Sequence, residues 1–260
     1  MRHRLLLTGP EGSGKSQAIV DLAKLLSHRE VYAFDAQESI APLLGEELPN
    51  LHIWLPEGEP AEAFEAYRAE VKEVRAKAKG GDWICFDPAD DWEELARQAY
   101  AETHFSQDWG DYVESKVKGG KLPFGGFEVG DWQAIRAKTY GTIVQTMGAS
   151  CRANVLVTAH LKDVVSWMKD GVQVFQSPKL PDAFKRAGVS PGGEAAIVGR
   201  CDIVLQLDHP TSKKWRIRTL GKGRGVAGQT VEFDWLDITD EDLSVFGVYC
   251  DQRGLEPKEE

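Results

Sequence analysis

The chain has 260 residues, of which 42% are hydrophobic and 28% charged, and its formal net charge at neutral pH is −10. This composition excludes an extensively disordered chain, and the length allows one large α/β domain or two small ones. The acidic balance argues against a surface that binds nucleic acid all round, so any such contact must come from local basic loops.

The amino-terminal residues do not resemble a targeting segment. A basic start at Arg2 and Arg4 is followed by an apolar run, Leu5–Leu7, that is too short for a signal-peptide core. No segment approaches the roughly 18 apolar residues that a membrane helix needs. The cysteines are widely spaced and form no C-x-x-C pair, which argues against a zinc ribbon or a disulfide framework. We therefore expect a cytoplasmic protein, in the host cytoplasm if it is phage-encoded, with no membrane contact.

The first predicted strand, Arg4–Thr8, leads into the sequence GPEGSGKS and then into a helical pattern that ends near Leu26. The spacing is G-x-x-x-x-G-K-[ST], and a strand before it and a helix after it are the context of a phosphate-binding P-loop. Glycines allow successive N–H groups to converge on an anion at the helix N-terminus. Lys15 would reach the β- and γ-phosphates, and Ser16 would ligate Mg²⁺. The predicted cofactor-binding residues are Gly9, Pro10, Glu11, Gly12, Ser13, Gly14, Lys15, Ser16 and Gln17.

Short β-rich runs alternate with helical patterns along the rest of the chain. Further strands are predicted at Val31–Asp35, Leu51–Leu55, Trp83–Asp87, Asn154–Thr158, Asp202–Leu207, Trp215–Leu220 and Thr230–Trp235. Apolar residues recur at helical spacing inside 60–79 and 131–150, and a helix is also expected over 91–103. This order predicts an α/β fold, in which helices cover both faces of a mostly parallel central sheet.

No repeat or composition break divides the chain, so we expect one domain over residues 1–250 and a polar tail over 251–260. The segment 104–130 is rich in Gly and aromatic residues, and 161–196 mixes Pro, Gly, Lys and apolar residues with little clear period. We interpret both as long functional loops.

The strand Trp83–Asp87 ends in a carboxylate, where a P-loop enzyme needs a negative group to hold the water shell of magnesium. Asp87 is therefore the second predicted metal residue besides Ser16. Asp90 and Asp91 follow closely and are interpreted as the N-cap and first turn of the next helix.

Four short segments resemble the RecA-like ATPases, and most of all the compact phage-type members associated with single-strand annealing and recombination. These segments are VYAFDAQE from Val31, WICFD from Trp83, NVLVTAH from Asn154 and RIRTLGKGRG from Arg216. The resemblance covers most of residues 4–235. It implies a RecA-like P-loop core that binds ATP and Mg²⁺, hydrolyses ATP and acts on single-stranded DNA.

The resemblance also implies roles for residues near the γ-phosphate. The family has a water-polarising glutamate in a motif like FDAE, whereas this chain has Gln37 at that place and Glu38 one position later. A glutamine can orient water but is no effective base, so hydrolysis is slow unless Glu38 substitutes through a shifted turn. His160 would end a strand between the P-loop strand and the Asp87 strand, and would act as the polar sensor of the γ-phosphate. Lys222 and Arg224 would reach a neighbouring subunit's γ-phosphate, or would form an ordinary basic turn.

Single-stranded DNA would contact two loops that flank the sensor strand. Cations interleaved with aromatic residues can bind phosphates and stack on bases without reading sequence, although the same aromatics could pack a loop onto the core. In the first loop the candidates are Lys116, Lys118, Lys121, Phe124 and Phe127. In the second they are Lys162, Trp167, Lys169, Phe175, Lys179, Phe184, Lys185 and Arg186. The chain shows neither the N-terminal extension nor the second DNA-binding domain of larger members, so we expect self-association through the core, with Lys222 and Arg224 acting in trans.

Two alternatives remain open. A small-molecule kinase shares the P-loop but needs an acceptor pocket and a lid with arginines, for which Arg186 and Arg200 are available. A nucleotide-gated loader or regulator without enzymatic activity would fit Gln37 and the acidic composition. The preference for ATP over GTP is also open.

Overall fold

The computed structural model describes residues 2–118, 127, 129–164, 166–169, 172–175, 182–191, 195–211, 214–220, 235–238 and 245–247. The helices of these residues are α1 (Lys15–Leu25), α2 (Pro60–Lys77), α3 (Ala89–Phe105), α4 (Trp109–Lys118), α5 (Val129–Thr146), α6 (Asp182–Ala187) and α7 (Ala195–Val198), together with the 3-10 turn η1 (Ala41–Leu43). The strands are β1 (Arg4–Gly9), β2 (Val31–Asp35), β3 (Leu51–Trp54), β4 (Trp83–Asp87), β5 (Asn154–Asp163), β6 (Ser166–Lys169), β7 (Val172–Phe175), β8 (Val189–Pro191), β9 (Ile203–Thr211), β10 (Lys214–Thr219) and β11 (Leu236–Asp237).

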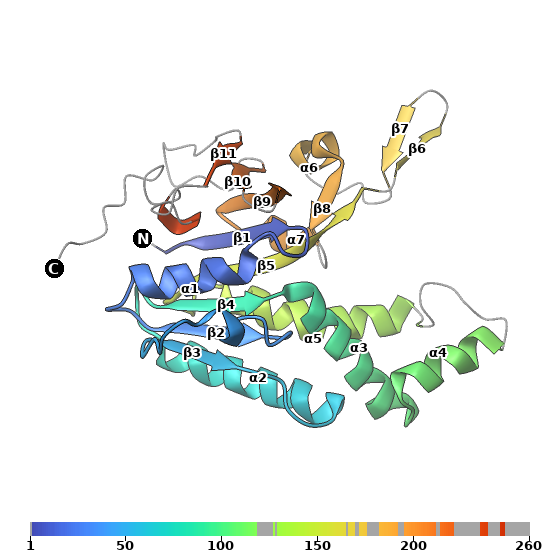
Figure 1. Cartoon of the computed structure of the whole chain (residues 1–260). Coiled ribbons are helices and arrows are strands. Elements are labelled where there is room, and N and C mark those ends of the chain that lie inside the picture. Colours follow the sequence, from blue (N-terminus) through green and yellow to red (C-terminus); the bar gives the residue numbers. More distant parts are fainter. Residues whose placement is uncertain are drawn as a thin grey trace.

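Most of these strands form one sheet in the order β11-β10-β9-β1-β5-β4-β2-β3 (Figure 1). The pairs from β9 to β3 are parallel, β10 and β11 add to one edge in the antiparallel sense, and β8 pairs antiparallel with the end of β5. The predicted α/β fold with a mostly parallel central sheet is therefore confirmed. The strand order also confirms that β5, which carries His160, lies between the P-loop strand and the Asp87 strand.

Both faces of the sheet are covered, and alternation along β1 shows how. Leu5 and Leu7 belong to a core cluster that includes α1, whereas Leu6 belongs to a second cluster that includes α2, α3 and α5. All three leucines are 1% exposed, so neither face of β1 meets solvent. A strand covered on both faces needs a continuous apolar run, which is the pattern that the sequence shows here.

An aromatic contact fixes the position of α3, the helix that follows Asp87. Trp92 in α3 stacks on Tyr67 in α2, with ring centroids 4.0 Å apart, and its indole Nε1 donates to the carbonyl oxygen of Phe34 in β2 at 3.3 Å. Both rings are fully buried. The first turn of α3, which carries Asp90 and Asp91, is therefore anchored to the sheet and to the neighbouring helix.

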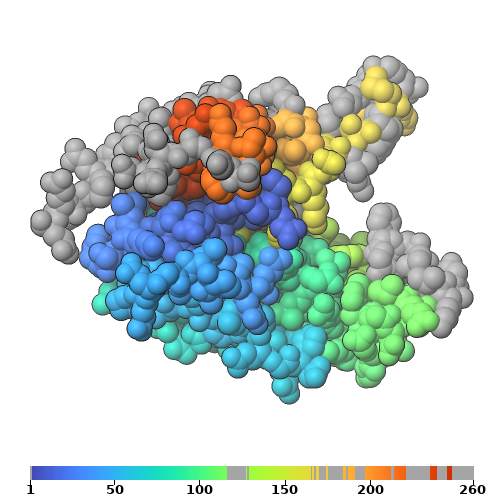
Figure 2. Space-filling model, viewed as in Figure 1, coloured from blue at the N-terminus to red at the C-terminus, as the bar shows by residue number. Residues whose placement is uncertain are grey.

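The two segments interpreted as loops contain regular structure, so this part of the prediction is wrong. Within 104–130 the structure has α4 and the start of α5, and within 161–196 it has the end of β5, the β6–β7 hairpin, α6, β8 and α7. The space-filling view shows the hairpin (yellow) standing away from the body of the molecule, with α4 (green) below it on the same side (Figure 2). Of the strand predicted at Thr230–Trp235, residues 230–234 lie outside the described residues, as does the tail at 251–260, and Trp235 directly precedes β11.

The aromatic residues of the first segment explain why it folds. Phe105, Trp109, Tyr112 and Phe127 pack on one another, with the rings of Phe105 and Tyr112 4.5 Å apart and those of Trp109 and Phe127 5.0 Å apart. Trp109, Tyr112 and Val113 recur at helical spacing along α4, and this apolar face packs into the aromatic cluster.

Within the described ranges, each helix is too short or too polar to serve as a membrane span.

Candidate nucleotide site

The predicted P-loop has a backbone conformation that requires glycine at two positions. It connects β1 to α1, and Gly12 and Gly14 adopt φ values of 71° and 90°, in the left-handed region that side chains disfavour. A Cβ at Gly9 would lie 2.8 Å from the carbonyl oxygen of Leu207 in β9, too close for any larger residue. The loop is therefore packed against the sheet at one end and opens toward solvent at the other.

Lys15 is held at the mouth of this loop. Its Nζ donates to the carbonyl oxygens of Gly9 at 3.1 Å and Pro10 at 2.9 Å, and the residue is buried. Burial lowers the pKa of Lys15, while the negative charge of Asp87 opposes that effect. A partly desolvated ammonium group is stabilised strongly by a further anion, so the loop is electrostatically prepared for a phosphate.

Asp87 closes β4 and is buried with its partners. The hydroxyl of Thr158 in β5 donates to its carboxylate, and Ser39 Oγ lies 3.2 Å from Asp87 Oδ2. Ser39 Oγ also lies 2.9 Å from Ser16 Oγ and so bridges the two predicted metal residues. Burial raises the pKa of Asp87, the Thr158 hydrogen bond opposes that rise, and the nearby carboxylate of Asp35 adds to it.

These groups border one cavity of about 320 Å³. It brings together five predicted residues with distinct roles, namely Lys15, Ser16, Gln37, Asp87 and His160. The full lining consists of Glu11, Gly12, Ser13, Gly14, Lys15, Ser16, Gln17, Gln37, Ser39, Leu43, Asp87, Pro88 and His160. Gly9 and Pro10 take part through the carbonyl groups that hold Lys15.

The turn after β2 presents Gln37, and not Glu38, to the cavity. The carboxylate of Asp35 accepts hydrogen bonds from the backbone N–H of Gln37 at 3.1 Å and of Ile40 at 2.8 Å, which fixes the turn. Gln37 borders the cavity, whereas Glu38 is exposed, has a φ of 56° and lies outside the lining. This geometry therefore does not support the alternative in which a shifted turn lets Glu38 act as the water-polarising glutamate.

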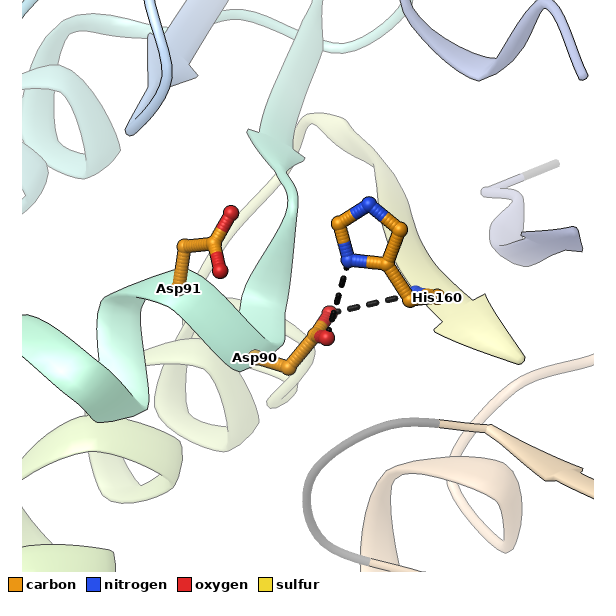
Figure 3. A group of neighbouring side chains, drawn as sticks. All are labelled: Asp90, Asp91 and His160. Carbon is orange, nitrogen blue, oxygen red and sulfur yellow. Dashed lines mark hydrogen bonds and ion pairs between the residues drawn. The ribbon is translucent and has the colours of Figure 1, made fainter. Parts of the chain in front are cut away.

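His160 is paired with the P-loop strand and held from the side by α3. Its backbone lies opposite Gly9 in the β1–β5 register. Its backbone N–H donates to Asp90 Oδ1 at 3.1 Å, and its ring Nδ1 lies 2.9 Å from Asp90 Oδ2 (Figure 3). Asp90 and Asp91 are in the first turn of α3 as expected, but the N-cap is Pro88, so the capping role for these carboxylates is wrong.

Three residues of the site were missed as functional residues by sequence reasoning. Ser39 has no motif around it, and its place next to Ser16 follows from the turn that Asp35 sets. Thr158 belongs to a strand in which a threonine is an ordinary residue. Asp90 could have been found, because a carboxylate that closely follows Asp87 in sequence lies near the same edge of the sheet. Its partner, His160, is 70 residues away in sequence.

The oxygen-rich surroundings of Asp87 fit Mg²⁺. Ser16, Ser39 and Asp87 offer hydroxyl and carboxylate oxygens, which are the ligands that hard divalent cations prefer. A buried carboxylate with a raised pKa is also the group whose ionised form a cation would stabilise most.

The candidate DNA-binding residues are spread over several elements. Lys162 at the end of β5 and Lys169 in β6 are exposed, and Lys185 in α6 is half-buried. Lys116 and Lys118 belong to α4, Trp167 to β6 and Arg186 to α6. Lys121, Phe124, Lys179, Lys222 and Arg224 lie outside the described residues.

Two of the aromatic residues considered for base stacking are core residues. Phe127 is 1% exposed and Phe184 is fully buried, so neither presents a face to a ligand, and the stacking interpretation is wrong for both. Phe127 packs in the aromatic cluster next to α4 instead. The alternative in which such residues pack their segments onto the core is therefore the correct one for these two.

Comparison with known proteins gives a limited result. Neither a protein-family model nor a curated protein sequence matches the chain. Among solved structures, the crystal structure of the RadB recombinase is similar, with a TM-score of 0.43 and 13% sequence identity over 85% of this chain and 84% of that chain. A likeness of this extent says nothing about activity or partners.

The raised pKa of Asp87 leads to a prediction about stability without ligand. A carboxyl group whose pKa is higher in the folded than in the unfolded state contributes stability at low pH, and this contribution is lost as the pH rises through the folded-state pKa. Ionised Asp87 is therefore unfavourable at neutral pH. We expect Asp87→Asn to raise the melting temperature at pH 7 by about 2–4 °C, which corresponds to roughly 1 kcal/mol.

The measurement is thermal unfolding of the apoprotein at pH 7 and at pH 4. The gain should shrink at the lower pH, because the raised pKa of Asp87 means that a larger share of the wild-type carboxyl is protonated there. An Asp87→Asn variant that melts below the wild type at both pH values would contradict this account.

Proposed function

We propose that the chain is a Mg²⁺-dependent, ATP-hydrolysing RecA-like protein that acts on single-stranded DNA in phage-type recombination or replication. The observation that carries the proposal is that Lys15, Ser16 and Asp87 border one cavity at the carboxyl ends of β1 and β4, with β5 between these strands. In open α/β sheets, ligands bind outside the carboxyl ends of the strands, and a P-loop at that edge is a triphosphate site.

Each lining residue has a role in this proposal. The amide groups of the P-loop would bind the phosphates, and Lys15 would stabilise the charge that develops on the transferred phosphoryl group. Ser16 and Asp87 would hold Mg²⁺, which supplies further charge neutralisation when bound. Gln37 would orient the attacking water without acting as a base, so we expect slow hydrolysis.

Support for DNA contact comes from the segment that follows His160. Lys162 on β5 and Lys169 on β6 expose ammonium groups on the strand and hairpin that lead away from the cavity. Figure 1 shows this hairpin and α4 on the side of the molecule toward which β1 and β4 run. Exposed ammonium groups on elements that leave the nucleotide site suit single-stranded DNA whose binding depends on the nucleotide. Lys222 and Arg224 are proposed to act on the nucleotide of a neighbouring copy.

The test is ATP turnover measured with and without single-stranded DNA, with GTP in a parallel assay. We expect slow basal turnover that single-stranded DNA stimulates. Stimulation by a small-molecule acceptor, with transfer of phosphate to it, would replace this proposal with a kinase. Nucleotide binding without any turnover would leave a nucleotide-gated module that is not an enzyme.

DNA binding is tested by its dependence on salt. For single strands, log K falls with log salt with a slope of about −0.7 per phosphate contact, so the double variant Lys162→Ala/Lys169→Ala should reduce the slope by about 1.4 if each lysine makes one contact. Lys24→Ala, which removes an exposed lysine from the far end of α1, is the matched control and should leave the slope unchanged. A wild-type protein whose turnover and binding ignore DNA would remove the recombination part and retain the nucleotide site.

A further inference from the structure

Asp90 gives both of its carboxylate oxygens to a single residue. Oδ1 accepts the backbone N–H of His160 at 3.1 Å, and Oδ2 lies 2.9 Å from the ring Nδ1 of the same residue. The side chains are 10% and 21% exposed, respectively, so the pair is largely shielded from water. Two contacts from one carboxylate restrain both the backbone and the ring of His160.

This arrangement decides which ring nitrogen is available. A carboxylate can only accept, so the nitrogen that faces it, Nδ1, carries the hydrogen. Figure 3 shows the second ring nitrogen pointing away from Asp90, and His160 borders the cavity that contains the P-loop residues. The ring therefore offers Nε2, and only Nε2, to whatever occupies the phosphate end of that cavity.

The carboxylate itself is held rigidly. Asp90 is in the first turn of α3, and two residues later Trp92 is fully buried and donates its indole N–H to Phe34 O in β2. His160 belongs to β5 and lies opposite Gly9 of the P-loop strand. The contact therefore joins two elements whose positions the sheet already sets, which is the usual way in which a functional side chain is held to a fraction of an ångström.

We propose that Asp90 is a positioning residue, which fixes the tautomer and the orientation of His160 so that Nε2 meets the terminal phosphate end of the nucleotide site. The statement that Nε2 meets a phosphate rests on the proposed function. The Asp90–His160 contact is independent of that function, because it forms without a nucleotide.

A cation site is the competing interpretation of the same residues. Asp90, Asp91 and His160 offer donor atoms that lie within 4.8 Å of one another. Both oxygens of Asp90 already accept hydrogen bonds from His160, so Asp91 and the ring Nε2 are the groups left to ligate a cation. A histidine that ligates a metal through Nε2 commonly donates its Nδ1 hydrogen to a carboxylate, so the contact itself fits both interpretations, and the experiment includes an outcome for the cation.

The experiment is nitrogen NMR of the histidine rings in protein labelled with ¹⁵N-histidine. The chain has six histidines, and His160→Gln identifies the His160 signals by their loss. At a pH at which free imidazole is neutral, we expect the wild type without nucleotide to show a protonated Nδ1 and an unprotonated Nε2. Asp91→Asn is the matched control, since it changes the neighbouring carboxylate without touching these hydrogen bonds, and its His160 pattern should equal that of the wild type.

Asp90→Asn should abolish the Nδ1-protonated pattern, and Asp90→Glu, which keeps the carboxylate, should restore it at least in part. In the turnover assay, we expect Asp90→Asn to lower kcat by about tenfold to 100-fold with little change in KM, because a misplaced ring on the order of 1 Å costs up to about 100-fold. Asp91→Asn should stay within about twofold of the wild type, because Asp91 makes neither of the hydrogen bonds that hold His160.

Two results would overturn the inference. One is an Asp90→Asn variant with the wild-type ring pattern, whatever its activity. The other is Mn²⁺ that broadens the His160 signals without nucleotide in the wild type but not in Asp91→Asn, which would indicate a cation site. If the wild type proves to have no ATP turnover, the NMR result still decides the role of Asp90, and only the proposed function fails.

Discussion

Lys15→Ala is expected to lower ATP turnover by about 100- to 1,000-fold, the range seen when one preorganised charge-stabilising group is removed from a phosphoryl- or acyl-transfer site. The side chain is buried against Gly9 and Pro10, and desolvation lowers its pKa, so its ammonium group interacts with a phosphate in surroundings of low polarity. Nucleotide binding should weaken as well, because the same charge contacts the β- and γ-phosphates before and during transfer.

Turnover is measured by phosphate release and binding by titration with a fluorescent ATP analogue. Lys24→Ala is again the control, since it removes the same charge from the last turn of the same helix, where the side chain is exposed. Equal losses in both variants would mean that the effect comes from α1 as a whole. If Lys15→Ala keeps the wild-type turnover, the nucleotide binds elsewhere and this cavity is not the ATP site.

Trp92→Ala is expected to lower the free energy of unfolding by about 3–5 kcal/mol, the range found when a large buried aromatic residue is truncated. Trp92 is completely buried, stacks on Tyr67 and satisfies the carbonyl group of Phe34. Its loss leaves a cavity between α2 and α3 and removes the hydrogen bond to Phe34 O. Because Trp92 anchors the turn that carries Asp90, the signals of His160 should also change. Denaturant unfolding gives the free energy.

Tyr67→Phe tests the same contact from the other side. Tyr67 Oη is buried, and among the described residues it has no hydrogen-bond partner, while the ring makes the stacking contact with Trp92. Burial accordingly raises the pKa of its phenol group. Removing the hydroxyl should therefore leave stability unchanged or raise it. A loss as large as that of Trp92→Ala would show that the hydroxyl is paired and that the packing account is incomplete.

The parts of the fold that the sequence predicts well are those in which local pattern and burial agree. Val31–Asp35 and Trp83–Asp87 were predicted with the bounds that the structure has, because each is an apolar run that ends in a carboxylate at the sheet edge. The P-loop was predicted because its glycines and its lysine have roles that depend only on neighbouring residues. The resemblance to the RecA-like ATPases implied a strand with His160 between the P-loop and Asp87 strands, and the sheet has this order. The strand was expected to end at His160 but continues to Asp163.

The remaining features depend on contacts between distant residues. The end of β5, over Leu161–Asp163, is extended because β8 pairs with it, and nothing in its own composition indicates that partner. The helix α4 packs on Phe127, which lies beyond the end of the helix, and nothing in the local sequence indicates that contact. The bond between Asp90 and His160 spans the chain from α3 to β5, so each residue had an ordinary local interpretation on its own.

Strand β5 changes its pairing partner at His160. His160 is the last residue of this strand in register with β1, and Leu161 is the first in register with β8. A shift of the backbone at His160 would therefore have to be accommodated in the pairing with β1 on one side and in the pairing with β8 on the other.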